Sequence, residues 1–135
     1  MLSHITIGTK DKARAEAFYT PLMAQLGLPR RDPAKTGPLV IFTPPHGGRP
    51  FFVIADPFDG GPQCAGNGNM VALLAPSRAV VDEIYTLACL NGARDEGAPG
   101  LRPQYHPNYY GAYFRDLDGN KVCIVCHDPV EESEA

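Results

Sequence analysis

The sequence lacks the long apolar run, about 20 residues, that a membrane-spanning helix requires. It also lacks an excess of basic residues, since its net charge is −3. Nucleic acids and anionic membranes bind basic surfaces, so neither is an expected partner. The first residues show neither the basic nor the apolar segment of a secretory signal peptide, and we expect the protein in the cytoplasm.

Several catalytic signatures are missing too. Neither the G-x-S-x-G motif of serine hydrolases nor the H-E-x-x-H motif of zinc peptidases occurs. The segment Gly66–Asn69 is rich in glycine, but it does not stand between a strand and a helix as a phosphate-binding loop does. The sequence therefore gives no support to a hydrolase, a zinc peptidase or a nucleotide-binding loop.

Cysteine is scarce, and the spacing of its four copies does not form a secreted disulfide framework, so free thiols are expected. Cys123 and Cys126 spell C-x-x-C, which is also found in zinc and redox sites. However, Lys121–His127 has the pattern of a strand, on which residues three apart point to opposite faces. No second C-x-x-C completes a four-ligand zinc site. We interpret both as ordinary strand cysteines, with a zinc or redox role as the alternative.

What is present fits one globular domain: 135 residues, of which 44% are hydrophobic and 20% charged. Residues 2–8 alternate, which predicts a strand with Ile5 and Ile7 against a helix. A helix is expected over Lys12–Leu26, starting at Thr9 or Asp11, with a kink or restart at Pro21. Extended segments and a loop follow in the first half, at Pro29–Asp32, Leu39–Thr43, Phe51–Ala55 and Asp56–Asn69.

The second half repeats this order. Met70–Ala75 predicts a strand and Arg78–Asn91 an amphipathic helix, with Pro76 and Ser77 at its start. Residues 93–108 contain a short strand around Arg94 and a turn-rich stretch. Two final strands, Tyr109–Arg115 and Lys121–His127, flank the hairpin turn Asp116–Asn120. Each half has one helix to cover one face of its sheet, which leaves the other face free to line a cavity or to pack on a neighbour.

Three stretches carry a resemblance to a known family: His4–Gly8 with Ala17–Leu22, then Gly66–Ala72, and finally Tyr109–Asn120 with its continuation to His127. They resemble the glyoxalase / bleomycin-resistance / extradiol-dioxygenase superfamily, the vicinal oxygen chelate fold, over roughly residues 2–127. The resemblance implies an α+β fold in which two βαβββ modules form a curved, cup-shaped mixed β-sheet. Module one would span about 1–56, the linker 57–68, module two 69–127 and an acidic tail 128–135.

The resemblance also implies a divalent metal in the cup, held by four strands. The first ligand position matches His4, the second falls within the apolar Phe51–Ile54, the third aligns with Met70 and the fourth with Cys123. Magnesium and manganese prefer oxygen ligands, whereas His, Met and Cys form a soft set that favours Cu(I) or Zn²⁺. We therefore expect an incomplete metal site in which His4 is the one standard ligand.

Some of these residues are also candidates for catalysis. His4 could act as an acid, a base or an anchor for a ligand, or it could be an ordinary hydrogen-bonded histidine. Cys123 could be reactive if it is exposed in the cup, or simply a small buried residue. For Met70 the plain interpretation is apolar filling.

The densest polar and aromatic stretch runs from Arg102 to Tyr110. Its rings, together with Tyr113, could stack on a ligand or donate hydrogen bonds, and Arg102 could pair with a carboxylate or phosphate. The alternative is a proline-rich loop pinned by tyrosines. Phe51, Phe52 and Phe58 could line the pocket or fill the core. The candidate substrate-binding residues are Arg102, Tyr105, His106, Tyr109, Tyr110, Phe52 and Met70.

Three classes of function remain open at this stage. The first is a glyoxalase-like lyase, or a dioxygenase, that acts on a small oxygenated molecule with help from a metal. The second is a metal-free protein that binds or sequesters a small molecule, as resistance proteins of this superfamily do. The third is a scaffold that binds no ligand. In the first two cases the expected partners are a small-molecule ligand and a second copy of the chain in a homodimer.

Overall fold

The computed structural model describes residues 1–130, so most of the predicted acidic tail, residues 131–135, lies outside the described residues. The first half contains β1 (His4–Gly8), α1 (Lys12–Gln25), α2 (Pro33–Thr36), β2 (Val40–Phe42) and β3 (Phe51–Ala55). The second half contains β4 (Val71–Leu74), α3 (Arg78–Leu90), β5 (Arg94–Leu101), β6 (Tyr110–Arg115) and β7 (Lys121–Cys126). None of the helices in residues 1–130 has the length and apolar character needed to cross a bilayer.

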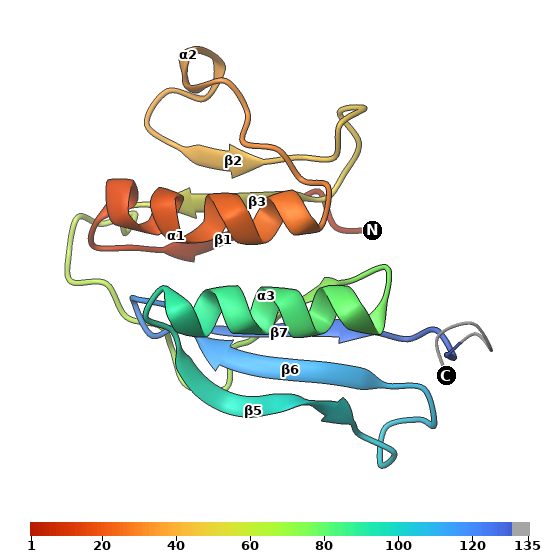
Figure 1. Ribbon diagram of the computed structural model, residues 1–135. Helices are drawn as coiled ribbons and strands as arrows, with labels where there is room; N and C mark the ends of the chain where they lie inside the picture. The colour runs from red at the N-terminus through yellow and green to blue at the C-terminus, as the bar shows by residue number, and fades with distance from the viewer. Residues whose placement is uncertain (131–135) are drawn as a thin grey trace.

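The strands form two sheets, in the orders β1-β3-β2 and β4-β7-β6-β5. In each sheet the first strand is parallel to its neighbour and the remaining pairs are antiparallel. The helices α1 and α3 lie side by side on one side of the two sheets (Figure 1). The predicted α+β class with two similar modules is confirmed. We call the faces of both sheets that are turned away from α1 and α3 the cup face.

The first module has one strand fewer than predicted. The segment expected to be extended over Pro29–Asp32 contributes only one isolated bridge, between Arg30 and Phe42. The chain then forms the short helix α2, which the sequence reading missed. Asp32 starts this helix by accepting a hydrogen bond from the backbone N–H of Ala34, and Pro33 suits the first helical position.

The two long helices begin where capping chemistry predicts. Asp11 accepts a hydrogen bond from the backbone N–H of Arg14 at 3.1 Å, and Ser77 accepts one from that of Val80 at 3.2 Å. Pro21 does not restart α1, contrary to one of the two expectations. It removes a single backbone donor, and the burial of Phe18 and other apolar residues on the same helix outweighs that loss.

The core lies between the two helices and the sheets and draws on both modules. Ile7 is buried in it and Ile5 packs against it, as the alternation of the first strand predicts. Its largest fully buried side chains include Tyr19, Met23, Phe42, Ile54, Ile84, Phe114 and Ile124. Each such side chain contributes about 1.5–3 kcal/mol when it leaves water, so the core is the main source of stability.

The strand β5 begins at the short strand predicted around Arg94 and continues through residues whose glycines and proline had predicted turns. It pairs with β6 through an irregular register that shifts on either side of Gly97. Gly97 has a φ of 154°, which glycine tolerates best. Proline has no backbone N–H to donate to a neighbouring strand. Pro99 is tolerated here because β5 is an edge strand. The bulges therefore let a turn-like sequence continue the sheet.

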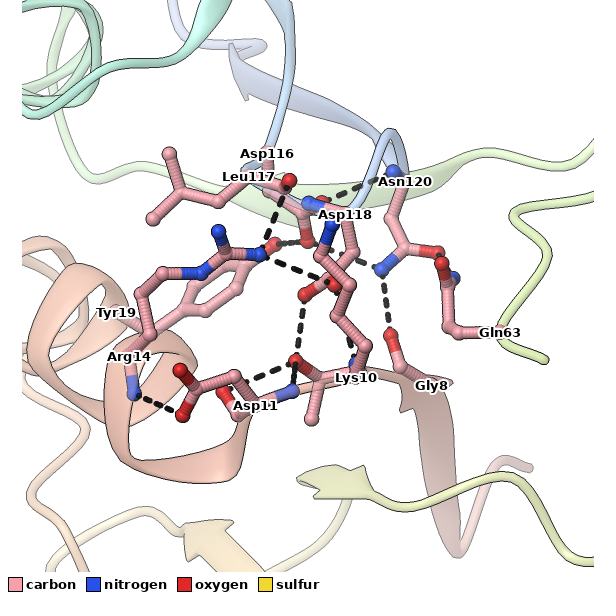
Figure 2. A network of polar contacts seen from close by, with 11 residues as sticks. Gly8, Lys10, Asp11, Arg14, Tyr19, Gln63, Asp116, Leu117, Asp118 and Asn120 are labelled. Carbon is pink, nitrogen blue, oxygen red and sulfur yellow. Dashed lines mark hydrogen bonds and ion pairs between the residues drawn. The ribbon is translucent and has the colours of Figure 1, made fainter. Parts of the chain in front are cut away.

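The hairpin turn at Asp116–Asn120 fastens the second module to the first (Figure 2). The carboxylate of Asp118 accepts hydrogen bonds from the hydroxyl of Thr9 at 2.6 Å and from the backbone N–H of Lys10 at 3.1 Å. The Arg14 guanidinium lies 3.4 Å from the same carboxylate, whose side chain is only 2% exposed. Asp118 thus holds the junction between β1 and α1.

The neighbouring residues of the turn extend this contact. Asn120 donates to the carbonyl of Gly8 at 2.9 Å, and Gln63 of the linker donates to Asn120. Asp116 accepts a hydrogen bond from the hydroxyl of Tyr19 inside the core. Burial and this carboxylate raise the pKa of Tyr19 well above its ordinary value, so the phenol stays protonated and donates. We call this set of contacts the module clamp.

Candidate binding site

A pocket of about 570 Å³ opens on the cup face of the second module. This volume lies in the range of small-molecule sites. A second hollow of about 520 Å³ adjoins it between β1 and β4, and the two share Gly68, Asn69, Met70 and Lys121. The larger pocket is lined by Asn67, Gly68, Asn69, Met70, Tyr105, Tyr109, Tyr113, Arg115 and Lys121.

Tyr109 forms the floor of this pocket because Gly111 leaves room for its ring. A Cβ atom on Gly111 would lie 2.9 Å from Cε1 of Tyr109. The Tyr109 hydroxyl lies 2.8 Å from that of Tyr113 and 3.5 Å from the sulfur of Cys123. Its ring also contacts the ring of Tyr105, with centroids 4.8 Å apart. The floor therefore combines two phenols with an aromatic surface.

Cys123 lies beneath these tyrosines and is fully buried. Burial raises the pKa of its thiol, although hydrogen bonds from Tyr109 and Tyr113 act in the opposite direction. The thiol is therefore protonated at neutral pH, which does not suit a nucleophile. Cys126 lies on the other face of β7 in the core, as residues three apart on a strand predict. All four cysteines are free.

Two histidines hold the loop of residues 102–109, which we call the tyrosine loop, at its far end. Nδ1 of His106 accepts the backbone N–H of Asn108 at 3.1 Å. Its other nitrogen, Nε2, lies 2.8 Å from Nδ1 of His127. In a neutral His106, Nε2 therefore carries the proton and donates it to His127. Both imidazole rings also pack against the ring of Tyr109. These contacts hold Tyr109 in place at the floor of the pocket.

Cationic side chains gather at the same face. The guanidinium of Arg115 donates to Glu96 at 3.0 Å and to the carbonyl of Gly119 at 3.1 Å. This pairing holds the pKa of the Glu96 carboxyl below its ordinary value. The Lys121 ammonium lies 5.7 Å from the centre of the Tyr113 ring, and no acidic residue within 1–130 forms an ion pair with it.

Most of the predicted site residues lie at or next to this pocket. Tyr105, Tyr109 and Met70 line it. Arg102 lies beside it, 5.5 Å from the centre of the Tyr113 ring, and donates to the carbonyl of Ala98. Two further predicted residues, His106 and Cys123, contact Tyr109 from behind and below.

Two predicted residues lie elsewhere, because strand alternation turns them to the helix side. Phe52 is buried in the core, with its ring 5.2 Å from that of Tyr19. Tyr110, the neighbour of Tyr109, donates its hydroxyl to Asp82 of α3 at 2.6 Å. Burial and this hydrogen bond raise the pKa of Tyr110 to about 12. Neither residue lines the pocket, where the sequence pattern had placed both.

His4 is exposed at the start of β1 and lies outside the lining of both pockets. Its Nδ1 lies 3.0 Å from the hydroxyl of Ser3. In the parallel pair of β1 and β3, His4 stands opposite Phe51, an aromatic residue without a metal-binding atom. Among residues 1–130, His4 belongs to no group of three or more potential metal ligands.

The metal expected from the resemblance does not fit these residues. Among residues 1–130, no group of three or more His, Cys, Asp or Glu side chains is arranged to hold a metal ion. The four aligned positions offer an exposed imidazole, an apolar strand, a thioether and a buried thiol that is protonated at neutral pH. Magnesium or manganese would need oxygen ligands that are missing from this set.

The sequence reading missed Lys121 and Arg115 as pocket residues. They stand opposite each other in the β6–β7 ladder, and Tyr113 stands opposite Cys123 on the same face. Side chains two apart on a strand share a face, so Lys121 shares the face of Cys123 and Arg115 that of Tyr113. This alternation could have identified both residues. Asn67 and Asn69 belong to the loop before β4, whose course no periodic pattern predicts.

The structure is similar to several solved proteins. A glyoxalase/bleomycin resistance protein from Albidiferax ferrireducens T118 matches with a TM-score of 0.81 and 31% identity, covering 95% of this chain and 99% of that one. A lactoylglutathione lyase from Agrobacterium tumefaciens matches with a TM-score of 0.62 and 25% identity, covering 93% and 92%. A glyoxalase/bleomycin resistance protein/dioxygenase family enzyme from Burkholderia phytofirmans PsJN, at 17% identity and a TM-score of 0.70, shares the fold over 93% and 98%.

No protein-family model matches the sequence, and no curated protein matches it either. The match at 31% identity nevertheless spans nearly the full length of both chains. Together with the two modules and the helix-free cup face, it places this chain in the glyoxalase/bleomycin resistance/dioxygenase superfamily.

Proposed function

We propose that this protein binds a small oxygenated molecule in the cup-face pocket without a metal ion. The observation that carries the proposal is the position of Tyr109, which covers Cys123 at the place where the superfamily resemblance expects a metal ligand. Phenol hydroxyls and aromatic rings face the pocket there instead of a carboxylate. Such a surface holds a ligand by stacking and hydrogen bonding, as metal-free members that sequester a ligand would.

A glyoxalase-like lyase that acts on a small oxygenated molecule is the second candidate. The match to a lactoylglutathione lyase at 25% identity favours it, because that match covers 93% of this chain. In that case His4 would serve as a metal ligand, because it is the one standard ligand among the four aligned positions. The homodimer and the cytoplasmic location remain predictions, and sedimentation and cell fractionation would test them.

Metal analysis separates the two candidates. We expect the protein, purified without added metal, to contain no stoichiometric metal ion, and His4→Ala to leave the metal content unchanged. One tightly bound ion per chain that disappears in His4→Ala would contradict the binding proposal and favour the lyase.

Thermal unfolding with small aromatic compounds tests the pocket itself. A ligand at about 100 times its Kd should stabilise the folded state by about 2.7 kcal/mol. Tyr105→Ala should remove this gain, since Tyr105 lines the pocket. Phe58→Ala is the matched control, because Phe58 is a fully exposed aromatic residue of the linker that does not line the pocket. Equal loss in both variants would show that binding occurs elsewhere.

A further inference from the structure

We infer that the ligand of this pocket is a small aromatic anion, with its carboxylate or phosphate between Lys121 and Arg115 and its ring against Tyr105. The inference rests on the proposed function and narrows it to a class of compound. It also makes Lys121 the residue that determines the preference for charge.

The charge balance of this face supports an anion. Four cationic side chains gather around Tyr113 and Glu96: Arg102 and Lys121 lie near the Tyr113 ring, and Arg94 and Arg115 lie near the Glu96 carboxylate. Two of them bind Glu96, and none of the residues that line the pocket is acidic. The protein as a whole is acidic, with a net charge of −3. A local cationic surface attracts anions even when the protein as a whole is acidic.

Lys121 is the cation with the most freedom to bind one. It is the first residue after the hairpin turn, so the module clamp fixes its backbone. Its ammonium lies near the face of Tyr113, and no carboxylate within 1–130 forms an ion pair with it. Arg115 stands opposite it in the ladder. A carboxylate or phosphate between the two would gain charge-assisted hydrogen bonds, which are about twice as strong as neutral ones.

The two phenols suit an anion as well. The hydroxyls of Tyr109 and Tyr113 lie 2.8 Å apart, so one donates to the other. The second proton is then free to point to Cys123 or to an oxygen atom of the ligand. Burial raises the pKa of both tyrosines, so both remain protonated donors at neutral pH. A pair of neutral hydroxyl donors can stabilise the negative charge of a bound anion.

The aromatic part of the ligand follows from Tyr105. This side chain is 63% exposed, yet its ring is held against Tyr109 with centroids 4.8 Å apart. The ring is tilted by 53° against that of Tyr109, and the residue also lines the pocket. An exposed and supported aromatic ring is a ready surface for stacking another ring. The pocket of about 570 Å³ is large enough for such a compound.

Calorimetric titration with matched probes tests the inference. The probes are benzoate and phenyl phosphate as anions, benzamide as the neutral analogue of benzoate, and inorganic phosphate as an anion without a ring. We expect one or both aromatic anions to bind at least about tenfold more tightly than benzamide, as one charge-assisted contact would give. Benzoate and phenyl phosphate together distinguish a carboxylate ligand from a phosphate ligand.

Lys121→Met should reduce the affinity for the aromatic anion by about tenfold and leave the affinity for benzamide unchanged. Lys121→Arg should retain the preference for the anion. Lys35→Met makes the same change of charge on α2 of the first module, where Lys35 is exposed, and should have no effect. A melting curve of each free variant establishes that it is folded.

The possible outcomes separate the inference from the proposed function. Benzamide that binds as tightly as the anions overturns the inference but leaves a metal-free binding protein. Inorganic phosphate that binds as tightly as phenyl phosphate overturns the aromatic part. If Lys121→Met and Lys35→Met weaken the anion equally, Lys121 has no special role. If no probe of any charge binds, the inference fails together with the proposed pocket.

Discussion

The two modules share an order of elements but differ in what their cup faces carry. In the first, three strands present an exposed His4 and the ring of Phe51. In the second, four strands present phenols, a buried thiol and the larger pocket. The comparison teaches that the repeated architecture places a cup face on each module, whereas the side chains of one module supply most of the candidate site.

One detail makes the contrast sharper, because each module has an aromatic ring near two cations. Phe51 lies 3.8 Å from Arg49 and 5.6 Å from Arg31, measured from the guanidinium carbon to the ring centre. Tyr113 lies 5.5 Å from Arg102 and 5.7 Å from Lys121. Only Tyr113 has a hydroxyl, and it joins the hydrogen-bonded pair of the pocket floor.

The largest expected effect on the free energy of unfolding comes from weakening the module clamp. Asp118→Ala removes the buried acceptor shared by Thr9, Lys10 and Arg14, and the free energy of unfolding should fall by about 3 kcal/mol. Urea unfolding measures this change. Asp128→Ala, at an exposed position after β7, is the control and should stay within about 0.5 kcal/mol of the wild type. Equal effects in the two variants would mean that the clamp does not stabilise the fold.

A smaller effect should follow from filling the space beneath the pocket floor. Gly111→Ala places a methyl group 2.9 Å from Tyr109, so the ring must move away from β6. We expect a loss of about 2 kcal/mol in the free energy of unfolding from overpacking. Gly48→Ala, which has open space around its Cβ position in the first module, should be nearly neutral.

The same pair of variants reports on Cys123. Its thiol is covered in the wild type and its pKa lies above the ordinary value of 9.0, so alkylation should be slow at pH 8. Displacing Tyr109 in Gly111→Ala should speed the alkylation of Cys123, as peptide mapping by mass spectrometry can measure. An unchanged rate would show that Tyr109 does not protect the thiol.

The smallest effect concerns the far end of the tyrosine loop. His127→Ala removes the acceptor of His106 and should cost about 1 kcal/mol or less, because both rings are accessible. The local consequence should be faster hydrogen exchange at Asn108, whose N–H binds His106. His46→Ala, in an exposed loop of the first module, should leave this exchange rate unchanged.

Most elements could be predicted because their patterns are local. The alternation around Ile5 and Ile7, the caps at Asp11 and Ser77, and the turn at Asp116–Asn120 each follow from neighbouring residues. Only the start of β5 around Arg94 was predicted, since the rest of the strand exists through pairing with β6 and its own glycines indicate turns. The helix α2 was missed because four residues carry no periodic signal.

The site was predicted in part for a similar reason. Tyr105 and Tyr109 stood out by composition, but composition does not say which face of a strand a residue occupies. Phe52 and Tyr110 were assigned to the pocket although alternation turns them to the core side. Lys121 gave no signal of its own, because its meaning depends on Tyr113 and Arg115 from a neighbouring strand.

The module clamp also has a consequence for the order of events during synthesis. Asp118 and Thr9 are 109 residues apart in the chain, so their hydrogen bond cannot form until the last hairpin has left the ribosome. β1 and α1 are synthesised first, but their contact with Asp118 forms only after the last hairpin has been synthesised. Contacts of such high sequence separation slow folding, since a long loop must close before the contact forms. A nascent chain that stops before residue 118 should therefore remain open to proteases at its N-terminal half.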